Sequence, residues 1–402
     1  MKVFYFCFRF ESKSNNSNSD INYIQVIMDS KVFEATQLGG VNLNNRIIRS
    51  ATQEIMAQNG NVSNRLLDMY DELSKSGVGL IITGYMTFSQ TDNHSPSTLC
   101  IENDERIQKL KTLTDKVHRN GTKIIAQLAH LGSQILQESN VSTFGPSEIK
   151  EPFNGLIPKA LTIDQIKSIV TEFGQAALRA KKARFDGIQI HAAHGYLLSK
   201  FLSPVFNKRN DEYGGNIENN ARIILEVVNE IKETCGKNFP VWIKLNSADY
   251  GQEQDSFDFN SAIATAKLLE KEGIDAIEMS GGTPTGQLSP SRSQQHEAYH
   301  SAKAQILSSE INTPVIAVGG FRDFKKVKSI LNESNIKAIS LSRALIRQPN
   351  LVKQWKDGDE TTAKCIACNG CFNLNGIACI YNLDKEERKV QQAFLKKFFA
   401  NN

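Results

Sequence analysis

The stretch Gly187-Ile-Gln-Ile-His-Ala-Ala-His-Gly-Tyr196 begins as a short apolar run and ends in side chains that can take part in chemistry. Short apolar runs followed by helical patterns are typical of strands buried on both faces of a parallel sheet. The same unit recurs along the chain, with apolar runs at 47–50, 80–85, 123–128, 241–245, 276–279, 315–318 and 338–341. Eight strand–helix units favour an α/β fold closed into a (β/α)8 TIM barrel over an open doubly wound sheet.

The expected helices carry recognisable ends. They follow the apolar runs at 64–76, 105–120, 162–184, 217–233, 259–272, 302–309, 324–332 and 350–355. Glycine can adopt the left-handed conformation that ends a helix, and it follows four of these patterns, as Gly77, Gly121, Gly236 and Gly273. Thr162 with Gln165 three residues later predicts a capping box at the start of the third helix.

Length and composition indicate a globular protein with a large core. The chain has 402 residues, of which 40% are hydrophobic and 22% charged. A formal net charge of +4 is too small to indicate nucleic-acid binding. No apolar stretch approaches the roughly 20 residues of a membrane span. Three of the seven cysteines are scattered and four cluster near the C-terminus, which favours a reducing compartment and a cytoplasmic location.

The chain divides into three expected parts. Residues 1–28 combine a short apolar run with a Ser/Asn-rich segment, so we expect a disordered extension, with a targeting peptide as the alternative. Residues 29–356 contain the eight units of the barrel. Residues 357–402 contain the cysteine cluster and a stretch over 385–399 whose apolar spacing predicts an amphipathic helix. That helix is expected to pack on the barrel or on a second copy of the chain, with a membrane surface as a further alternative.

Polar residues, three glycines and one alanine follow the strands at the end where TIM barrels place their chemistry. They are Ser50, Ala51, Thr52 and Gln53 after the first strand, Gly84, Gln127, His191 and Lys244 at the next ones, and Gly319, Gly320, Ser342 and Arg343 after the last two. The last two strands are where barrels bind phosphate, because glycine lets backbone N–H groups approach an anion. The alternative is that these glycines only form tight turns.

His191, His194 and Tyr196 form the most distinctive group. Two imidazoles that converge on one point can donate hydrogen bonds to a substrate oxygen and stabilise charge that develops there. A tyrosine hydroxyl can supply a proton in the same step. A zinc site is the alternative for the histidine pair, but no third ligand stands at an obvious spacing.

Gln127 and Lys244 suggest a bound heterocycle. The amide of Gln127 can donate and accept hydrogen bonds at once, which suits the edge of such a ring. The cation of Lys244 can stabilise negative charge on a reduced ring. It can also serve as a Schiff-base lysine in an aldolase-type barrel.

The run from His191 through Ser203-Pro204 and Asn207–Asp211 to Tyr213-Gly-Gly215 resembles the signature of the Old Yellow Enzyme family of FMN-containing NAD(P)H:flavin oxidoreductases. The likeness extends from Asn45 to Asn350. It implies an FMN-dependent oxidoreductase that takes hydride from NADH or NADPH and passes it to an α,β-unsaturated carbonyl compound or another small electron acceptor.

The resemblance implies roles at matching positions. His191 and His194 match the pair that binds the carbonyl oxygen, and Tyr196 matches the tyrosine that protonates the α-carbon. The remaining positions match residues around FMN: Ser50, Ala51, Thr52 and Gln53 along the flavin, Gly84 facing the ring, Gln127 on the pyrimidine edge, and Gly319, Gly320, Ser342 and Arg343 at the phosphate. Three positions depart from the family pattern: Gln53 stands where cysteine or threonine is frequent, Lys244 where arginine is frequent and Ser342 where glycine is usual.

The cluster Cys365-Ile-Ala-Cys368-Asn-Gly-Cys371, with Cys379 beyond it, resembles the iron–sulfur region of the 2,4-dienoyl-CoA reductase and trimethylamine dehydrogenase branch. Four such thiolates suit a [4Fe–4S] cluster or a zinc ion, and a structural loop without metal is the third alternative. No Gly-x-Gly-x-x-Gly fingerprint follows it. A flavin-binding electron-transfer subunit or redox sensor without alkene chemistry is therefore an alternative to the ene-reductase.

Overall fold

The computed structural model describes residues 31–89, 92, 95–135, 142–251, 256–284, 297–373 and 376–400. The disordered extension predicted over 1–28 lies outside these residues. The strands are β1 (Thr36–Leu38), β2 (Val41–Leu43), β3 (Ile47–Arg49), β4 (Leu80–Met86), β5 (Lys123–Leu128), β6 (Phe144–Gly145), β7 (Lys159–Ala160), β8 (Ile188–Ala192), β9 (Val241–Asn246), β10 (Ala276–Ser280), β11 (Val315–Val318) and β12 (Ala338–Leu341).

The helices alternate with the strands. They are η1 (Lys31–Phe33), α2 (Asn64–Lys75), α3 (Arg106–His118), α4 (Ile163–Lys182), α5 (Leu197–Leu202), α6 (Ile217–Cys235), α7 (Phe259–Lys271), α8 (Ser301–Glu310), α9 (Phe324–Glu333), α10 (Arg343–Arg347), α11 (Leu351–Lys356) and α12 (Lys385–Ala400). Gly77, Gly121, Gly236 and Gly273 all have positive φ. Thr162 and Gln165 form the reciprocal capping box at the start of α4. Both predictions about helix ends are therefore confirmed.

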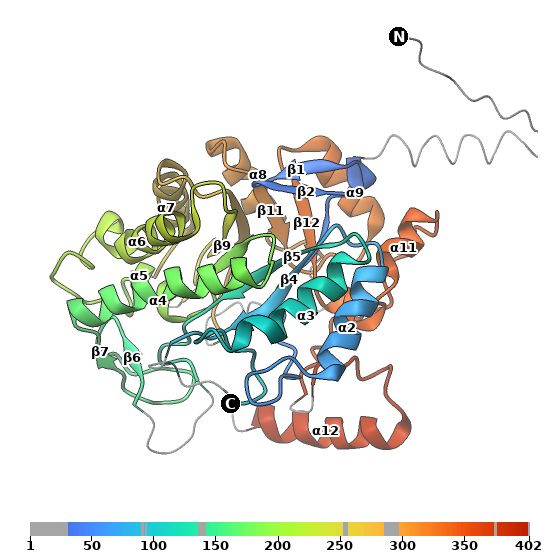
Figure 1. The fold of residues 1–402 in the computed structure, drawn as a ribbon, viewed down its shortest axis with the longest axis horizontal. Coiled ribbons are helices and arrows are strands. Elements are labelled where there is room, and N and C mark those ends of the chain that lie inside the picture. The colour runs from blue at the N-terminus through green and yellow to red at the C-terminus, as the bar shows by residue number, and fades with distance from the viewer. Residues whose placement is uncertain are drawn as a thin grey trace, which may run out of the picture.

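Eight strands close into a barrel in the order β10-β11-β12-β3-β4-β5-β8-β9. All eight neighbouring pairs are parallel, and β12 pairs with β3 through Ile339 and Ile47. Helices surround this barrel (Figure 1). The (β/α)8 TIM barrel predicted from the eight apolar runs is confirmed, and each run contains its strand to within one or two residues.

A small hairpin that the sequence pattern did not predict covers the end of the barrel where the strands begin. Strands β1 and β2 pair antiparallel around Gly39 and Gly40, both with positive φ. The carbonyl of Gly39 accepts a hydrogen bond of 2.9 Å from the indole of Trp242, at the start of β9. Leu38, Val41 and Leu43 pack with the side chains inside the barrel. This hairpin therefore covers the end of the barrel that lies opposite the strand ends.

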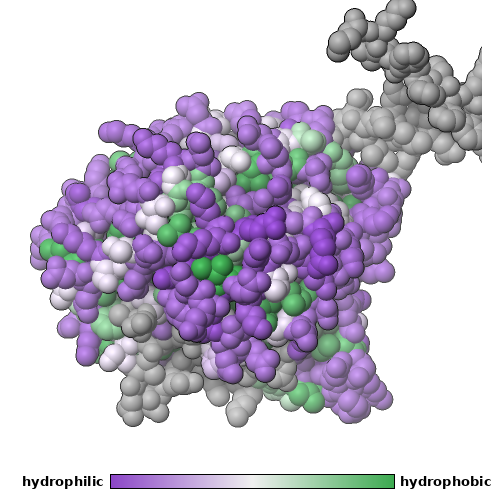
Figure 2. All heavy atoms as spheres, viewed as in Figure 1, coloured by the Kyte–Doolittle hydropathy of each residue, from purple (hydrophilic) through white to green (hydrophobic). Residues whose placement is uncertain are grey.

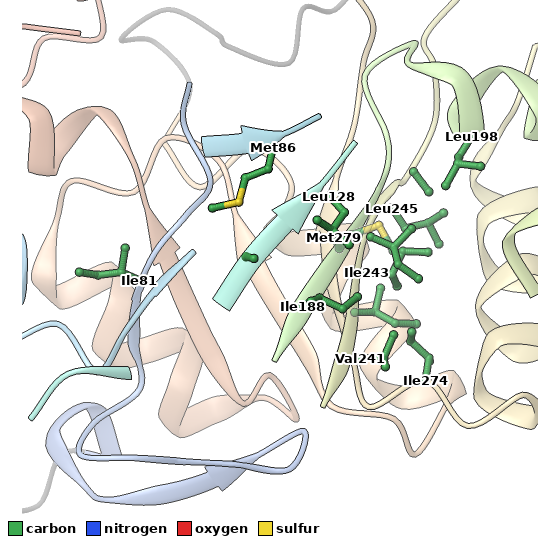
Figure 3. Packing of buried hydrophobic residues seen from close by; sticks show 14 of the residues in the cluster. Ile81, Met86, Leu128, Ile188, Leu198, Val241, Ile243, Leu245, Ile274 and Met279 are labelled. Atoms are coloured by element: carbon green, nitrogen blue, oxygen red, sulfur yellow. The ribbon is translucent and has the colours of Figure 1, made fainter. Parts of the chain in front are cut away.

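A second apolar layer lies between the strands and the helices around them. Figure 3 shows Ile188, Val241 and Ile243 from β8 and β9 packed beside Ile274. Because both faces of each strand are buried, the strands read as continuous apolar runs. Burial of the two layers holds the strand ends in fixed positions around the mouth of the barrel.

The face of the molecule drawn in Figure 2 is mostly hydrophilic, and apolar residues appear on it as separate patches. Among the residues that the structure describes, none of the helices is both long enough and apolar enough to span a membrane. The helix predicted over 385–399 is confirmed as α12, which packs on the cysteine-containing segment through buried Gln391 and through Phe394 against Phe372. Val390, expected on the apolar face, is 67% exposed.

Candidate active site

A cavity of about 1070 Å³ opens at the end of the barrel where the strands finish. This exceeds the range of roughly 300–1,000 Å³ that is usual for a single small ligand. Eleven of the residues predicted to bind the cofactor or the substrate line it: Ser50, Ala51, Thr52, Gln53, His194, Tyr196, Lys244, Gly319, Gly320, Ser342 and Arg343. Gly84, Gln127 and His191 are not part of its wall. The cavity is large enough for a cofactor together with a substrate.

The end of β8 brings three rings together. The ring of His191 lies 5.2 Å from that of His194 and 4.8 Å from that of Tyr196, both nearly perpendicular to it. His194 adopts a φ of +63°, which a bulky residue adopts only when its surroundings hold it there. The side chains of His194 and Tyr196 line the cavity, and the ring of His191 packs against both.

Neighbouring strands hold His194 in place. Its backbone N–H donates to Oδ1 of Asn246 at 3.2 Å, and its Nε2 lies 2.7 Å from Oγ of Ser280. Asn246 is itself oriented, because its amide donates to Asp249 Oδ1 at 2.8 Å. Burial raises the pKa of Asp249 to about 6. The sequence analysis singled out none of these three supporting residues for this role.

Burial sets the protonation of the three rings. It lowers the pKa of His194 to about 3, and the nearby Lys244 cation adds to this effect. Burial also holds the pKa of His191 well below its ordinary value, with smaller contributions from His194 and Lys244. Burial raises the pKa of Tyr196 to about 12. Both histidines are therefore neutral and the tyrosine is protonated at neutral pH.

The imidazole of His191 has a defined tautomer. Its Nδ1 accepts a hydrogen bond of 3.3 Å from the backbone N–H of Ala193. In a neutral imidazole only one nitrogen carries a proton. The proton of His191 is therefore on Nε2, which leaves this nitrogen as a donor.

A buried polar network fills the barrel interior beneath the cavity. Lys244 Nζ lies 2.6 Å from Glu278 Oε2 and donates to Ser50 Oγ at 3.1 Å. Gln127 donates to Gln189 at 2.7 Å, and Gln189 donates to Glu278 at 2.8 Å. The sequence analysis missed Gln189 and Glu278. The available signal was a polar residue in the middle of an apolar strand, in Ile188–Ala192 and in Ala276–Ser280.

Gly84 contacts a carboxylate. Its N–H donates to Glu54 Oε1 at 2.8 Å, and a Cβ at this position would lie 2.1 Å from Glu54 Oε2. The same carboxylate accepts from Tyr70 at 2.6 Å and pairs with Arg49 at 3.1 Å. Glycine is required here because the buried Glu54 side chain occupies the space of a Cβ. The role predicted for Gly84, facing a flavin ring, stays a prediction.

Tyr85 is a wall residue that the sequence analysis missed. The pairing of β4 with β5 shifts register between Ile82 and Tyr85, and such irregularities re-aim side chains near active sites. Tyr85 lines the cavity with its ring 5.7 Å from that of Tyr196. Burial keeps the pKa of Tyr85 well above its ordinary value. The position of Tyr85 in the apolar run 80–85 did not indicate that its side chain lines the cavity.

The last two strands connect the cavity to the cysteine segment, which we define as residues 365–379. Arg343 lines the cavity and donates to the carbonyl of Ala367 at 3.3 Å and to Asn369 Oδ1 at 2.6 Å. Cys365 and Cys371 also line the cavity. The segment thus forms one wall of the cavity, which the sequence did not indicate.

All four clustered cysteines line a second, small hollow beside this wall. Cys365, Cys368, Cys371 and Cys379 share it with three cationic residues, Arg343, Arg347 and Lys364. Among the described residues no three His, Cys, Asp or Glu side chains are arranged so that they could hold a metal ion. The metal site predicted for the four cysteines, and the zinc alternative for His191 and His194, therefore stay predictions.

Comparison with known proteins gives one consistent match. The model of the NADH:flavin oxidoreductase / NADH oxidase family matches residues 31–362. An NADH oxidase of Thermoanaerobacter brockii is 33% identical over 351 residues, which cover 85% of this chain and 53% of that protein. An NADPH dehydrogenase of Clostridium acetobutylicum is 32% identical over 323 residues, 80% of this chain and 93% of that protein.

Solved structures agree with these matches. An Old Yellow Enzyme homologue from Zymomonas mobilis superposes with a TM-score of 0.70 and 26% identity, over 84% of this chain and 95% of that one. The chain spans about half the length of the NADH oxidase it matches and of a metal reductase of Desulforamulus reducens, where it covers 54%.

Proposed function

The chain belongs to the NADH:flavin oxidoreductase / NADH oxidase family, and from that premise we propose that it is an FMN-dependent NAD(P)H oxidoreductase that reduces α,β-unsaturated carbonyl compounds. One observation carries the proposal: His194 and Tyr196, with the ring of His191 packed against both, line the same cavity as the strand ends predicted to bind the phosphate of a cofactor.

The wall of the cavity fits FMN. Gly319 and Gly320 line the cavity, and both have positive φ, a conformation that exposes backbone N–H groups more readily in glycine than in other residues. The buried hydroxyl of Ser340, also in the wall, has no hydrogen-bond partner among the described residues. Ser342 and Arg343 add a hydroxyl and a cation, which are suitable partners for phosphate oxygens. When bound, FMN supplies the hydride transfer from NAD(P)H to the β-carbon of the substrate.

The histidines would hold the carbonyl oxygen. His191 has its proton on Nε2. In this proposal Ser280 donates to Nε2 of His194, so that Nδ1 carries the proton and faces the substrate. Two neutral donors in a buried site stabilise the negative charge that develops on the oxygen as hydride reaches the β-carbon. They bind without placing a full charge next to the neutral substrate.

Tyr196 would complete the reaction. Its hydroxyl gives a proton to the α-carbon, and solvent returns the proton to the tyrosine. The balance is one hydride from NAD(P)H and one proton per alkene reduced. The raised pKa of Tyr196, about 12, keeps the hydroxyl protonated and ready to donate. NADH and NADPH are both candidate reductants.

The contacts of Lys244 weigh against an aldolase. A Schiff-base lysine must lose its proton to attack a carbonyl. The amine of Lys244 is engaged by the Glu278 carboxylate at 2.6 Å and by Ser50 Oγ at 3.1 Å, so it is not free to attack a carbonyl. Its position instead suits a fixed cation beside the cofactor.

We also propose that the four cysteines bind a [4Fe–4S] cluster or zinc, which requires the thiolates to move closer together than they lie in this structure. Four cysteines and three cations line one hollow, and no carboxylate lies among its lining residues. Cations around four thiolates offset their negative charge. Iron, acid-labile sulfide and zinc analysis of anaerobically purified protein tests this, and absence of all three contradicts it.

The central experiment is reconstitution with FMN. We expect the purified protein to bind FMN stoichiometrically and to oxidise NADH or NADPH in the presence of a cyclic enone, with the saturated ketone as product. Protein that binds no FMN contradicts the proposal. Protein that binds FMN and oxidises NAD(P)H with ferricyanide but not with enones supports an electron-transfer role instead.

A further inference from the structure

Glu278 is a fully buried carboxylate in the barrel interior that has no part in the proposed reaction. It belongs to β10 and its side chain has 0% exposure. Its Oε1 accepts from Ser50 Oγ at 2.8 Å. Its Oε2 accepts from Gln189 Nε2 at 2.8 Å and lies 2.6 Å from Lys244 Nζ. Such a residue is costly to bury unless its partners are fixed around it.

Three residues predicted to bind the cofactor are connected to this carboxylate, two directly and one through another side chain. Ser50 and Lys244 contact it directly and line the cavity. Gln127 is linked to it through Gln189, whose oxygen accepts from the Gln127 amide at 2.7 Å. Glu278 itself does not line the cavity. It can therefore affect a bound cofactor only through these neighbours and through its charge.

The charge of Glu278 opposes that of Lys244. Burial raises the pKa of Glu278, but the Lys244 cation and three hydrogen bonds outweigh burial, so that the net shift is downward. The carboxylate is therefore ionised at neutral pH. A bare cation beside a bound flavin would stabilise the negative charge gained on reduction. A carboxylate at 2.6 Å cancels most of that field.

We propose that Glu278 sets the reduction potential of the bound flavin by neutralising Lys244 and fixing its position, so that the potential is lower than the lysine alone would make it. Glu278 is then a positioning residue and does not touch the reacting atoms. This inference rests on the proposed function, because it requires FMN in the cavity.

The test is the midpoint potential of FMN in Glu278→Gln, measured by spectroelectrochemical titration of the reconstituted protein. Glutamine keeps the size and the hydrogen-bonding capacity but removes the charge. We expect the equilibrium to shift about tenfold toward reduced flavin, which is about 30 mV upward for two electrons. A variant that binds FMN with an unchanged or lower potential overturns the inference. Failure of the wild-type protein to bind FMN would instead overturn the proposed function.

Two further variants separate charge from structure. Glu278→Asp keeps the charge, so its potential should stay near that of the wild type. Lys244→Met removes the cation that keeps Glu278 ionised, and the buried carboxyl should then take up a proton. The net charge at positions 244 and 278 is then zero in both the wild type and the variant. We therefore expect little shift in the potential of FMN. A clear fall in potential for Lys244→Met would show that Lys244 acts as an unopposed cation and would overturn the inference.

A double variant completes the cycle. With Lys244→Met already present, Glu278→Gln replaces a neutral acid with a neutral amide, and the potential should not change further. If Glu278→Gln instead raises the potential by the same amount in both backgrounds, Glu278 acts independently of Lys244, which also overturns the inference.

Discussion

The end of β8 and the cysteine segment both form walls of the cavity, but they are held in different ways. His194 is fixed by Asn246 from β9 and by Ser280 from β10. These strands belong to the closed barrel and are buried on both faces. Any movement of this wall would require the barrel itself to deform.

The cysteine segment is attached by a few long-range contacts. Arg343 holds Asn369, the backbone N–H of Ile377 donates to the carbonyl of Glu54 at 2.7 Å, and Gln391 of α12 donates to the carbonyl of Gly370. The residues proposed for the substrate chemistry are therefore held by strands of the barrel. The cysteine segment adds a wall whose position depends on side chains outside the strands.

Tyr196→Phe should produce the largest effect. It should impair the function of the end of β8 and leave the cysteine segment unchanged. Loss of the hydroxyl should slow enone reduction by reduced flavin by about 10²–10⁴-fold, because the proton donor is removed. Reduction of the flavin by NAD(P)H should be nearly unchanged. Stopped-flow measurement of the two half-reactions checks this.

Tyr213→Phe is the matched control for that variant. Tyr213 is buried in the same sequence signature, and its hydroxyl donates to Glu226 at 2.9 Å, but it does not line the cavity. It should lose about 1 kcal/mol of stability and no activity. Equal losses in both half-reactions of Tyr196→Phe would contradict the role assigned to Tyr196.

Arg343→Ala should have the next largest effect, because Arg343, at the start of α10, both lines the cavity and holds the cysteine segment. Loss of a charged donor in the wall should weaken FMN binding by roughly 10–100-fold. Loss of its contacts with Ala367 and Asn369 should also expose the cysteine segment to proteolysis. Fluorescence titration with FMN and limited proteolysis measure the two effects.

Arg347→Ala separates the two effects. Arg347 lines the small hollow and contacts Asn382 and Tyr381, but it does not line the large cavity. We expect faster proteolysis of the cysteine segment with unchanged FMN affinity. If Arg347→Ala weakens FMN binding as much as Arg343→Ala, the wall is one unit and the distinction between the regions is wrong.

The sequence predicted the barrel and most of the cavity because both depend on local patterns. Continuous apolar runs define strands, and strand ends define the mouth of a barrel, so that Ser50 or Arg343 could be placed from position alone. The contacts between elements could not be predicted in this way. Glu278 and Gln189 lie in the middle of strands, and their partnership depends on the tilt and register of the barrel.

Other features were missed because tertiary packing decides them. Tyr85 points into the cavity after a register shift that no residue preference marks. The hairpin β1–β2 has only three residues in each strand, too few for a clear pattern. Val390 belongs to the apolar spacing of residues 385–399 but is exposed, whereas Gln391 is buried and its amide bonds to the cysteine segment.

The smallest expected effect is that of pH on enone reduction. With the pKa of His194 near 3 and that of Tyr196 near 12, neither group changes protonation across the neutral range. His194 stays neutral above its lowered pKa, and Tyr196 stays protonated below its raised pKa. These two groups should therefore contribute no change in the rate of the enone half-reaction between about pH 5 and pH 9. A change larger than about twofold near pH 6.5 would contradict the neutral donor pair.

One group is expected to titrate inside that window. Asp249 has a pKa raised to about 6, and it orients the Asn246 amide that holds the backbone of His194. Ionisation of Asp249 strengthens the hydrogen bond from Asn246. We expect this to change the rate of enone reduction by about twofold at most, because Asp249 acts on His194 only through Asn246. Asp249→Asn should abolish any such step near pH 6 and leave the plateau unchanged. A step near pH 6 that persists in Asp249→Asn would show that a group other than Asp249 titrates there, and it would contradict the assignment of the step to Asp249.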